Sequence, residues 1–470
     1  MTWRDAADAA QAFLIVYFAA INLAYLALNA LSAFELRKRL EERLLGLLPR
    51  AYSPYELPVS IVVPAYNEAA TICTSVRSML QLEYPELEVI VVNDGSADAT
   101  LQELSREFEL APFPEAYRRR LPSAPVRGVY RSARFPNLRV IDKENGGRKA
   151  DAANAGINAA RYPLVCVVDA DTVLERSSLR RAAAPFLHQP ETIAVGGTVR
   201  IANGCEVRDG FLEAVGLPGR MLPLFQVMEY MRGFLFGRLG WAALNAVPIV
   251  SGAFGLFRRE AVVAAGGYNT QTLGEDMELV LRLHRLHRLG RRRYAIAFPP
   301  DPICWTEAPE SLGMLHNQRT RWQRGLGESL WLNRALICHP RGGALGWLAL
   351  PYMIAFEWAA PLIEVAGYVV MTAAFLLGMI DGEAFWTFML LAISAGMLVS
   401  MSALFLEEMS LHMYKRPQEL AALIAVALIE NFGYRQLTAL WRLQGLWQTA
   451  TGASARWGTM TRVANWQRND

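Results

Sequence analysis

The segment LVCVVDAD at residues 164–171 determines the fold class of this 470-residue chain. Its five apolar residues form a short run that ends in turn residues, which is typical of a buried strand in a parallel sheet. Similar runs occur at residues 59–64, 87–92 and 138–141, and helical patterns lie between them at residues 69–81 and 150–160. Strands that alternate with helices predict an α/β domain, in which helices cover both faces of a mostly parallel sheet.

Two local features carry separate expectations. The segment at residues 110–137 is rich in proline and arginine and interrupts the alternation, so we expect a long surface loop there. His284 and His287 lie on a helical stretch among many arginines. We expect them to belong to a solvated helix face rather than to a metal site.

The composition indicates that part of the chain lies in a membrane. Apolar residues make up 53% and charged residues 19%, which are above and below the usual shares of soluble proteins. The net charge of +3 and the lack of a long basic run in the sequence disfavour a nucleic-acid partner. The five cysteines form no C-x-x-C pair. This spacing disfavours a zinc site or a disulfide framework and suggests a reduced, cytosolic domain.

The apolar excess is concentrated at the two ends of the chain. Residues 12–34 carry no charge and exceed the roughly 20 residues that cross a bilayer. Basic residues follow them directly, which favours the cytoplasmic side for the next segment. Near the other end, residues 342–380 carry only Glu357 and Glu364 as charges, and residues 384–406 carry none. We predict membrane spans at all three segments.

The last apolar segment, residues 420–441, allows two interpretations. It contains Glu430, Asn431 and Arg435, so it is either a span that faces protein or an interfacial helix. The number of spans stays open at this point. The predicted division of the chain is a membrane helix with a basic linker at 1–50, an α/β domain with interfacial helices at 51–341, and membrane or interfacial helices at 342–470.

Acidic side chains follow the predicted strands at the edge where α/β sheets bind ligands. Asp169 and Asp171 come directly after a strand, and two carboxylates at this spacing can hold a hard divalent cation against a diphosphate. Asp94 follows another strand and could contact a nucleotide base or ribose. Aspartates at such positions also occur simply as turn or helix-capping residues, and that interpretation stays open.

Three further segments combine residue types that suit a nucleotide-sugar. Within residues 145–151, a glycine turn is followed by Arg148 and Lys149. This arrangement suits a phosphate-binding site, or it is simply a basic turn without a ligand. Glu275 and Asp276 open a helix, where the helix dipole favours acids in any case. The string QRTRW at residues 318–322 could mark a membrane interface or could clamp a pyrophosphate and stack on a sugar ring.

These strings, in this order, resemble the family 2 glycosyltransferases of the polysaccharide-synthase type, which include cellulose, hyaluronan, chitin and poly-N-acetylglucosamine synthases. The resemblance covers roughly residues 57–340. Its pieces are PAYNE at 64–68, NDGS at 93–96, KADAAN at 149–154, DAD at 169–171, SGAF at 251–254, ED at 275–276 and QRTRW at 318–322. Two positions depart from the family pattern: Gly274 replaces the threonine of T-E-D, and Asn93 replaces a second aspartate.

The resemblance implies a GT-A fold, a UDP-sugar donor and Mg²⁺ or Mn²⁺. At the nucleotide end it implies that Asp94 contacts the uridine, and that Asn67, Glu68 and Lys149 bind the donor. It further implies that Asp171 binds the metal, and that Asp169 supports the donor sugar or nucleotide and belongs to the metal site as well.

For the transfer itself, the resemblance implies that Asp276 is the general base beside Glu275. Gln318 would bind the nucleotide or donor, Arg321 would contact the diphosphate, and Trp322 would stack on the acceptor sugar. We expect inverting transfer to a growing β-linked polysaccharide that is exported between membrane helices, with accessory export subunits as further partners. Glu357, Glu364 and Glu430 are candidates for a polar lumen or for helix packing.

The expected location is the cytoplasmic (inner) membrane, with the catalytic domain in the cytosol. The nearest alternative function is transfer of a single sugar to a lipid or glycan acceptor. A catalytically silent membrane scaffold is disfavoured by the intact Asp171, Asp276 and Trp322. A Rossmann dehydrogenase is disfavoured because no G-x-G-x-x-G follows the first predicted strand.

Overall fold

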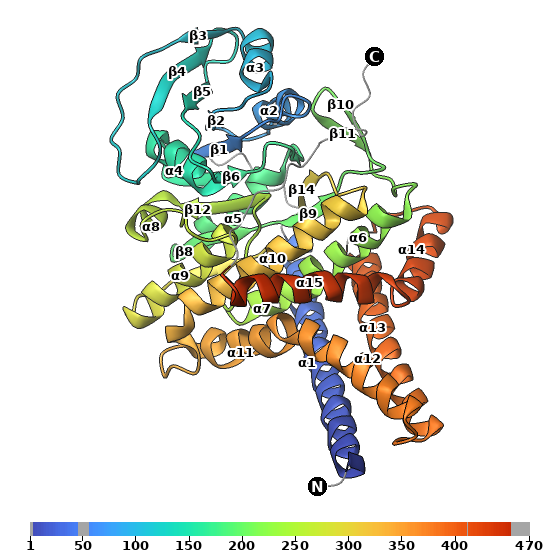
Figure 1. Cartoon of the computed structure of the whole chain (residues 1–470). Coiled ribbons are helices and arrows are strands. Elements are labelled where there is room, and N and C mark those ends of the chain that lie inside the picture. The colour runs from blue at the N-terminus through green and yellow to red at the C-terminus, as the bar shows by residue number, and fades with distance from the viewer. Residues whose placement is uncertain (1–2, 46–55, 411, 453–470) are drawn as a thin grey trace.

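The computed structural model describes residues 3–45, 56–410 and 412–452 (Figure 1). Four parallel strands form the centre of a sheet in the upper half of the molecule. In spatial order they are β6 (Leu164–Val168), β1 (Val59–Ala65), β2 (Leu87–Asn93) and β5 (Leu138–Lys143). Every residue of these strands is buried. The predicted central strands are therefore confirmed.

Helices pack on this sheet as the alternating pattern predicts. The helices are α2 (Ile72–Leu80), α3 (Thr100–Phe108), α4 (Lys149–Ala159) and α5 (Ser178–His188). Helix α4 lies against β1 and β2. A Cβ on Gly156 would come within 2.3 Å of the Val62 side chain, so glycine permits this close contact between helix and sheet.

The expectation of a long loop at residues 110–137 is wrong. This segment contains β3 (Leu110–Pro112) and β4 (Val126–Ser132), which add to β5 in antiparallel fashion and extend the sheet at one edge. Its proline and arginine residues are compatible with strands because edge strands have one unpaired, solvated side. Only residues 113–125 form a connecting loop.

The other edge of the sheet and two small sheets complete the domain. Strands β12 (Phe254–Arg258), β8 (Thr192–Gly196) and β13 (Ala295–Ala297) continue from β6. A three-stranded sheet contains β7 (Val173–Leu174), β14 (Pro302–Thr306) and β9 (Thr198–Ile201), and a hairpin contains β10 (Glu206–Arg208) and β11 (Phe211–Ala214).

A layer of helices lies between the sheet and the membrane-like helices (Figure 1). It comprises α6 (Met221–Met231), the π-helical η1 (Arg232–Arg238), α7 (Leu239–Ala243), α9 (Glu275–Leu289) and α10 (Leu312–Leu332). The short helix α8 (Arg259–Ala264) lies beside β12 at the level of the sheet (Figure 1). Helix α10 lies along α15 (Tyr434–Ala450), which comes from the far end of the chain.

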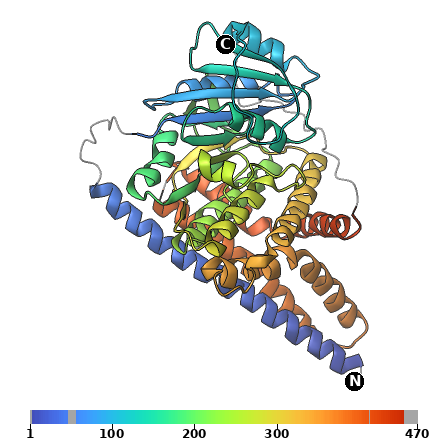
Figure 2. The ribbon, with the colours of Figure 1, turned by 90° about the vertical axis from the view of Figure 1, so that its left-hand side faces the viewer.

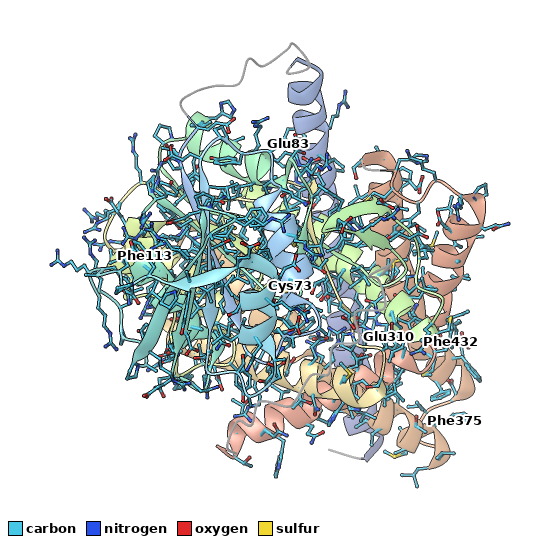
Figure 3. All side chains as sticks on the ribbon, turned by 90° about the horizontal axis from the view of Figure 1, so that it is seen from above. Cys73, Glu83, Phe113, Glu310, Phe375 and Phe432 are labelled. Carbon is cyan, nitrogen blue, oxygen red and sulfur yellow. The ribbon has the colours of Figure 1, made fainter. Side chains whose placement is uncertain are left out.

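Two helices of the described residues are long and apolar enough to cross a membrane: α1 (Trp3–Leu45) and α13 (Gly382–Ser410). Figure 2 shows α1 as one long helix along the side of the molecule. Exposed aromatic residues such as Phe375 and Phe432 lie at the periphery of the helical region (Figure 3). The predicted boundary at residue 50 falls in residues 46–55, outside the described residues.

The other two apolar segments are bent rather than straight. Residues 342–380, predicted as one span, form η3 (Leu345–Ala349), α11 (Leu350–Tyr352), η4 (Met353–Trp358) and α12 (Ala360–Leu376), with a 42° bend before α12. Residues 420–441 divide between α14 (Pro417–Ile429) and α15, which meet at 57°. Counting each bent pair as one span gives up to four spans.

Candidate active site

A cavity of about 1340 Å³ opens at the carboxyl ends of β1, β2 and β6 and continues between the membrane-like helices. All the side chains predicted as site residues line it. They are Asn67, Glu68, Asp94, Lys149, Asp169, Asp171, Glu275, Asp276, Gln318, Arg321 and Trp322. The structure thus brings together segments that are more than 250 residues apart in sequence, while their individual roles stay predictions.

The loops after β1 and β2 are hydrogen-bonded to each other at the end of the cavity where the nucleotide is predicted to bind. Asn67 has a left-handed backbone (φ 57°), and its Oδ1 accepts hydrogen bonds from the amides of Ala97 (2.9 Å) and Asp98 (3.4 Å). The amide of Glu68 donates to Thr100 Oγ1 at 2.9 Å. Asn67 therefore shapes the loop that contains Asp94 as well as lining the cavity.

Asp94 is nearly buried at the end of β2. Its Oδ1 accepts hydrogen bonds from Lys143 Nζ and from the amide of Gly146, the latter at 3.0 Å. Lys143 is fully buried and also pairs with Asp151 at 2.7 Å. A Cβ on Gly146 would lie 2.3 Å from the Asp151 carboxyl group, so this turn requires glycine. The sequence interpretation missed Lys143, which is the last residue of β5 and lies beyond the predicted run at 138–141.

Lys149 connects the glycine turn to the predicted metal-binding segment. At the start of α4, its Nζ donates to Asp169 Oδ1 and to the carbonyl oxygen of Gly252, the latter at 2.7 Å. Burial lowers the pKa of Lys149, but the neighbouring carboxylates, Asp169 first, outweigh burial and raise it. Lys149 is therefore a charged ammonium group at the base of the cavity.

Asp171 is almost fully buried, and its Oδ2 accepts a hydrogen bond from Thr306 Oγ1 at 3.4 Å. Within the described ranges, no group of three or more His, Cys, Asp or Glu side chains could hold a metal ion. Asp169 and Asp171 nonetheless fit a magnesium-like ion, because such ions are often bound by one or two carboxylates and complete their shell with water and substrate phosphates. Since Lys149 already pairs with Asp169, Asp171 is the better candidate for the direct ligand.

Glu275 and Asp276 form the first turn of α9. The amide of Met277 donates to Asp276 Oδ1 at 2.8 Å. Burial, together with the negative charge of Asp276, raises the pKa of Glu275 to about 7, although Lys149 and Arg321 oppose the shift. A Cβ on Gly252 would lie 3.4 Å from Lys149 Nζ and 3.5 Å from Asp276 Oδ2, so these two groups meet at one point of the cavity.

The departure at Gly274 has a packing explanation. A Cβ at this position would come within 2.8 Å of the carbonyl oxygen of Gly325 on α10. Two glycines therefore allow α9 and α10 to touch through their backbones. The predicted base and the QRTRW string are brought together by this contact.

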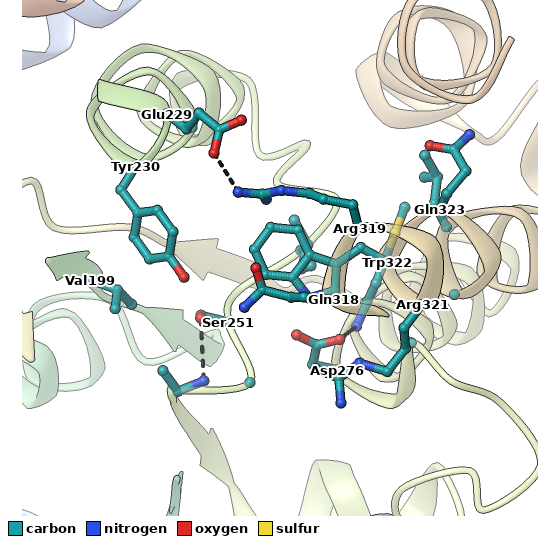
Figure 4. A pocket seen from close by; sticks show the side chains of 18 of the residues that line it. Val199, Glu229, Tyr230, Ser251, Asp276, Gln318, Arg319, Arg321, Trp322 and Gln323 are labelled. Atoms are coloured by element: carbon teal, nitrogen blue, oxygen red, sulfur yellow. Dashed lines mark hydrogen bonds and ion pairs between the residues drawn. The ribbon is translucent and has the colours of Figure 1, made fainter. Parts of the chain in front are cut away.

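The QRTRW string lies on α10, and all its residues except Thr320 line the cavity. Figure 4 shows Arg319 pointing toward Glu229 of α6. Arg319 pairs with Glu229 of α6, and its Cζ lies 4.5 Å from the centroid of the Trp322 ring. Tyr434 donates a 3.0 Å hydrogen bond to the same Glu229 carboxylate. Gln318 is mostly buried, and its Oε1 has no hydrogen-bond partner among the described residues. Trp322 keeps 43% of its surface exposed, so one part of its ring is available to a ligand.

The membrane half of the cavity contains two of the three predicted lumen acids. Glu357 accepts a 3.3 Å hydrogen bond from Tyr25 and lies 3.6 Å from Arg442, and Glu364 also lines the cavity. Glu430 is fully buried instead and pairs with Arg232. The packing alternative therefore holds for Glu430, and its assignment to a lumen is wrong.

The solvated helix face expected for His284 is also wrong. His284 is fully buried, with Nδ1 2.6 Å from the Tyr294 hydroxyl and Nε2 3.0 Å from the carbonyl oxygen of Val247. Burial lowers its pKa to about 3, so it is neutral. His284 fixes α9 to the strand layer and lies away from the cavity lining.

Comparison with known proteins supports the resemblance found in the motifs. The family Glycosyl transferase family 2 matches residues 60–263, and Glycosyl transferase family group 2 matches residues 164–404, just over half of the chain. The chain belongs to glycosyl transferase family group 2. The acids and arginines around the cavity thus lie in a transferase domain.

Among its relatives is a poly-beta-1,6-N-acetyl-D-glucosamine synthase from Staphylococcus epidermidis, which is 27% identical over 67% of this chain and 66% of the relative. A synthase with the same description from Staphylococcus aureus (strain COL) is 29% identical over 58% and 55%. The chain therefore spans roughly half to two thirds of the length of these curated relatives.

A solved structure shares the fold. It is a mannosyltransferase from Pyrobaculum calidifontis in complex with GDP-Man and Mn²⁺, with a TM-score of 0.52 and 20% identity, covering 90% of this chain and 99% of that one. The predicted GT-A fold class is confirmed.

Proposed function

We propose that this chain is an inverting membrane transferase that adds sugars from a UDP-sugar to a growing β-linked polysaccharide. One observation carries the proposal. Asp171, Lys149 and Asp276 line a single cavity, which continues to Glu357 and Glu364 between the apolar helices. The catalytic domain would face the cytosol and the helices would lie in the inner membrane, where α1 and α13 are long enough to cross it.

In the proposed reaction, Asp276 accepts the proton of the acceptor hydroxyl. The acceptor oxygen then forms a bond to the anomeric carbon, and the bond from that carbon to the UDP oxygen breaks on the opposite face. A well-placed base typically contributes about 10²–10⁴-fold. Asp171, supported by Asp169, would hold Mg²⁺ or Mn²⁺, which when bound neutralises charge on the diphosphate. Lys149 and Arg321 would offset the charge that grows on the departing UDP.

The acceptor would lie on Trp322. Aromatic rings bind the apolar face of a sugar, and Arg319 covers part of the ring, so the exposed part remains for the acceptor. The product would leave along the membrane half of the cavity, where tyrosine, glutamate and arginine side chains offer hydrogen bonds. Accessory subunits of export would join at that end.

The donor would be UDP-N-acetylglucosamine or UDP-glucose. The relatives named as poly-N-acetylglucosamine synthases favour the former. A second candidate function is transfer of a single sugar to a lipid acceptor. It is favoured by the apolar wall that α1 contributes to the same cavity through Phe18, Ile21 and Leu28.

The decisive experiment incubates the purified protein in lipid nanodiscs with each UDP-sugar, follows UDP release and sizes the product. A polymer supports the synthase, whereas a product one sugar longer than the acceptor supports the second candidate. Asp276→Asn should lower the turnover at saturating donor by about 10²-fold or more. Near-normal UDP release by that variant would rule out Asp276 as the base.

A further inference from the structure

Arg238 is a cation of the cavity wall that the proposed reaction does not use. It ends the π-helical segment η1 and lines the cavity close to β14. Its Cζ lies 3.8 Å from the centroid of the Phe234 ring, so the aromatic ring supports the guanidinium group. Its Nη1 is buried and has no hydrogen-bond partner among the described residues.

Four other cations of the cavity wall are paired with acids. Lys149 pairs with Asp169, Arg319 with Glu229, Arg232 with Glu430, and Arg442 with Glu357. Arg238 has no such ion pair within the parts of the chain that the structure describes. A buried guanidinium nitrogen without a hydrogen-bond partner is unfavourable. A ligand that supplies an oxygen acceptor would relieve this cost.

The surroundings of Arg238 indicate which ligand reaches it. The charge of Asp276 acts on Arg238, and Tyr230 is affected by both Arg238 and Asp171. Arg238 lines the same cavity as the predicted base Asp276 and the predicted metal ligand Asp171. In the proposed reaction, the transferred sugar must occupy the space between these two groups, because the diphosphate is at Asp171 and the acceptor is at Asp276.

We propose that Arg238 binds a carbonyl or carboxylate oxygen on the transferred sugar, so that the donor is an N-acetylated sugar or a uronate. Guanidinium groups bind such strongly polarised oxygens in preference to hydroxyls. The apolar Phe234 beside the guanidinium suits the methyl group of an acetamide. This inference rests on the proposed UDP-sugar transfer and adds to it the residue that selects the donor.

The test measures kcat/KM for UDP release from UDP-N-acetylglucosamine, UDP-glucuronate and UDP-glucose, with the full-length protein in nanodiscs. We expect the wild type to prefer one of the first two donors over UDP-glucose by at least tenfold. In Arg238→Met this preference should fall by tenfold or more, because the hydrogen-bonding group is lost. Arg238→Lys keeps the charge but loses the forked set of donors, so its donor preference should lie between those of the wild type and Arg238→Met. It also provides a second variant if the methionine variant folds poorly.

Arg148→Met is the matched control. Arg148 lines the same cavity next to Lys149. Its replacement should lower kcat/KM for all three donors by the same factor and leave the ratios between donors unchanged. The assignment would be overturned if the wild type used UDP-glucose as well as the other two donors. It would also be overturned if the Arg238 variants lowered kcat/KM for every donor by the same factor. The donor whose kcat/KM falls most in the Arg238 variants identifies the group bound by Arg238 as an acetamide or a carboxylate. If the wild type released UDP from none of the donors, the proposed function itself would fail.

Discussion

Replacing Glu229 by glutamine removes the charge that holds Arg319 beside Trp322. Glu229 belongs to α6, whereas Arg319 and Trp322 belong to α10. The carboxylate receives both Arg319 and the Tyr434 hydroxyl. Burial lowers the pKa of Arg319, but Glu229 outweighs this and raises it, which indicates that the ion pair is electrostatically favourable. In the proposed reaction, Glu229 acts on the acceptor through Arg319 and is therefore a positioning residue.

The expected magnitude follows from the burial of the pair. The Arg319 and Glu229 side chains are 8% and 21% exposed, which is between a surface pair, worth about 0–1 kcal/mol, and a buried pair, whose disruption costs about 3–5 kcal/mol. Glutamine keeps an oxygen acceptor, so the loss is reduced further. If the lost interaction makes the free energy of acceptor binding at Trp322 less favourable by about 1 kcal/mol, acceptor binding weakens roughly fivefold.

The assay varies an oligosaccharide acceptor at saturating UDP-sugar and measures UDP release. Glu229→Gln should raise the acceptor KM about fivefold and leave the donor KM and the acceptor-independent hydrolysis of UDP-sugar unchanged. Glu310→Gln is the control, because its partner Arg220 is 71% exposed. An unchanged acceptor KM together with a higher donor KM would refute the positioning role.

Three further outcomes follow from the same site. Gly274→Thr restores the family threonine, but its Cβ would press on Gly325. We therefore expect the free energy of unfolding, measured by thermal unfolding, to fall by about 1–3 kcal/mol. Gly313→Ala, where a Cβ meets nothing within 4 Å, is the control and should change it little. Because the pKa of Glu275 is raised from 4.5 to about 7, this group reduces stability as the pH rises from about 4.5 to about 7. The Tm difference between Glu275→Gln and the wild type should therefore shift in favour of the variant when the pH is raised from 5 to 8. A Tm difference that does not change with pH would contradict this. Removing divalent ions with EDTA should abolish UDP release, and Mg²⁺ or Mn²⁺ should restore it; full activity in EDTA would exclude the metal.

Short apolar runs predicted the central strands because burial on both faces leaves a strong local signal. Strand β4, which lies next to the edge strand β3, was missed because its exposed and half-exposed residues include Arg127 and Arg131, a composition that resembles a loop. Lys143 was missed for a different reason: it lies within β5, and its partner Asp94 is 49 residues away. Hydropathy located the apolar segments but not their bends, since composition does not record where a helix changes direction. The orientation of Glu430 likewise depends on Arg232, from a distant element.

Helix α10 joins the catalytic half of the cavity to its membrane half. Gln323, which directly follows Trp322, accepts a 2.8 Å hydrogen bond from Arg442 of α15 and donates a 2.9 Å bond to the carbonyl oxygen of Trp358. Arg442 also lies 3.6 Å from Glu357. The acceptor platform is therefore fixed to the bend between η4 and α12 as well as to the sheet. In the proposed reaction, movement of that bend would displace Trp322 relative to Asp276, so the membrane helices would contribute to the geometry of transfer in addition to any role in export.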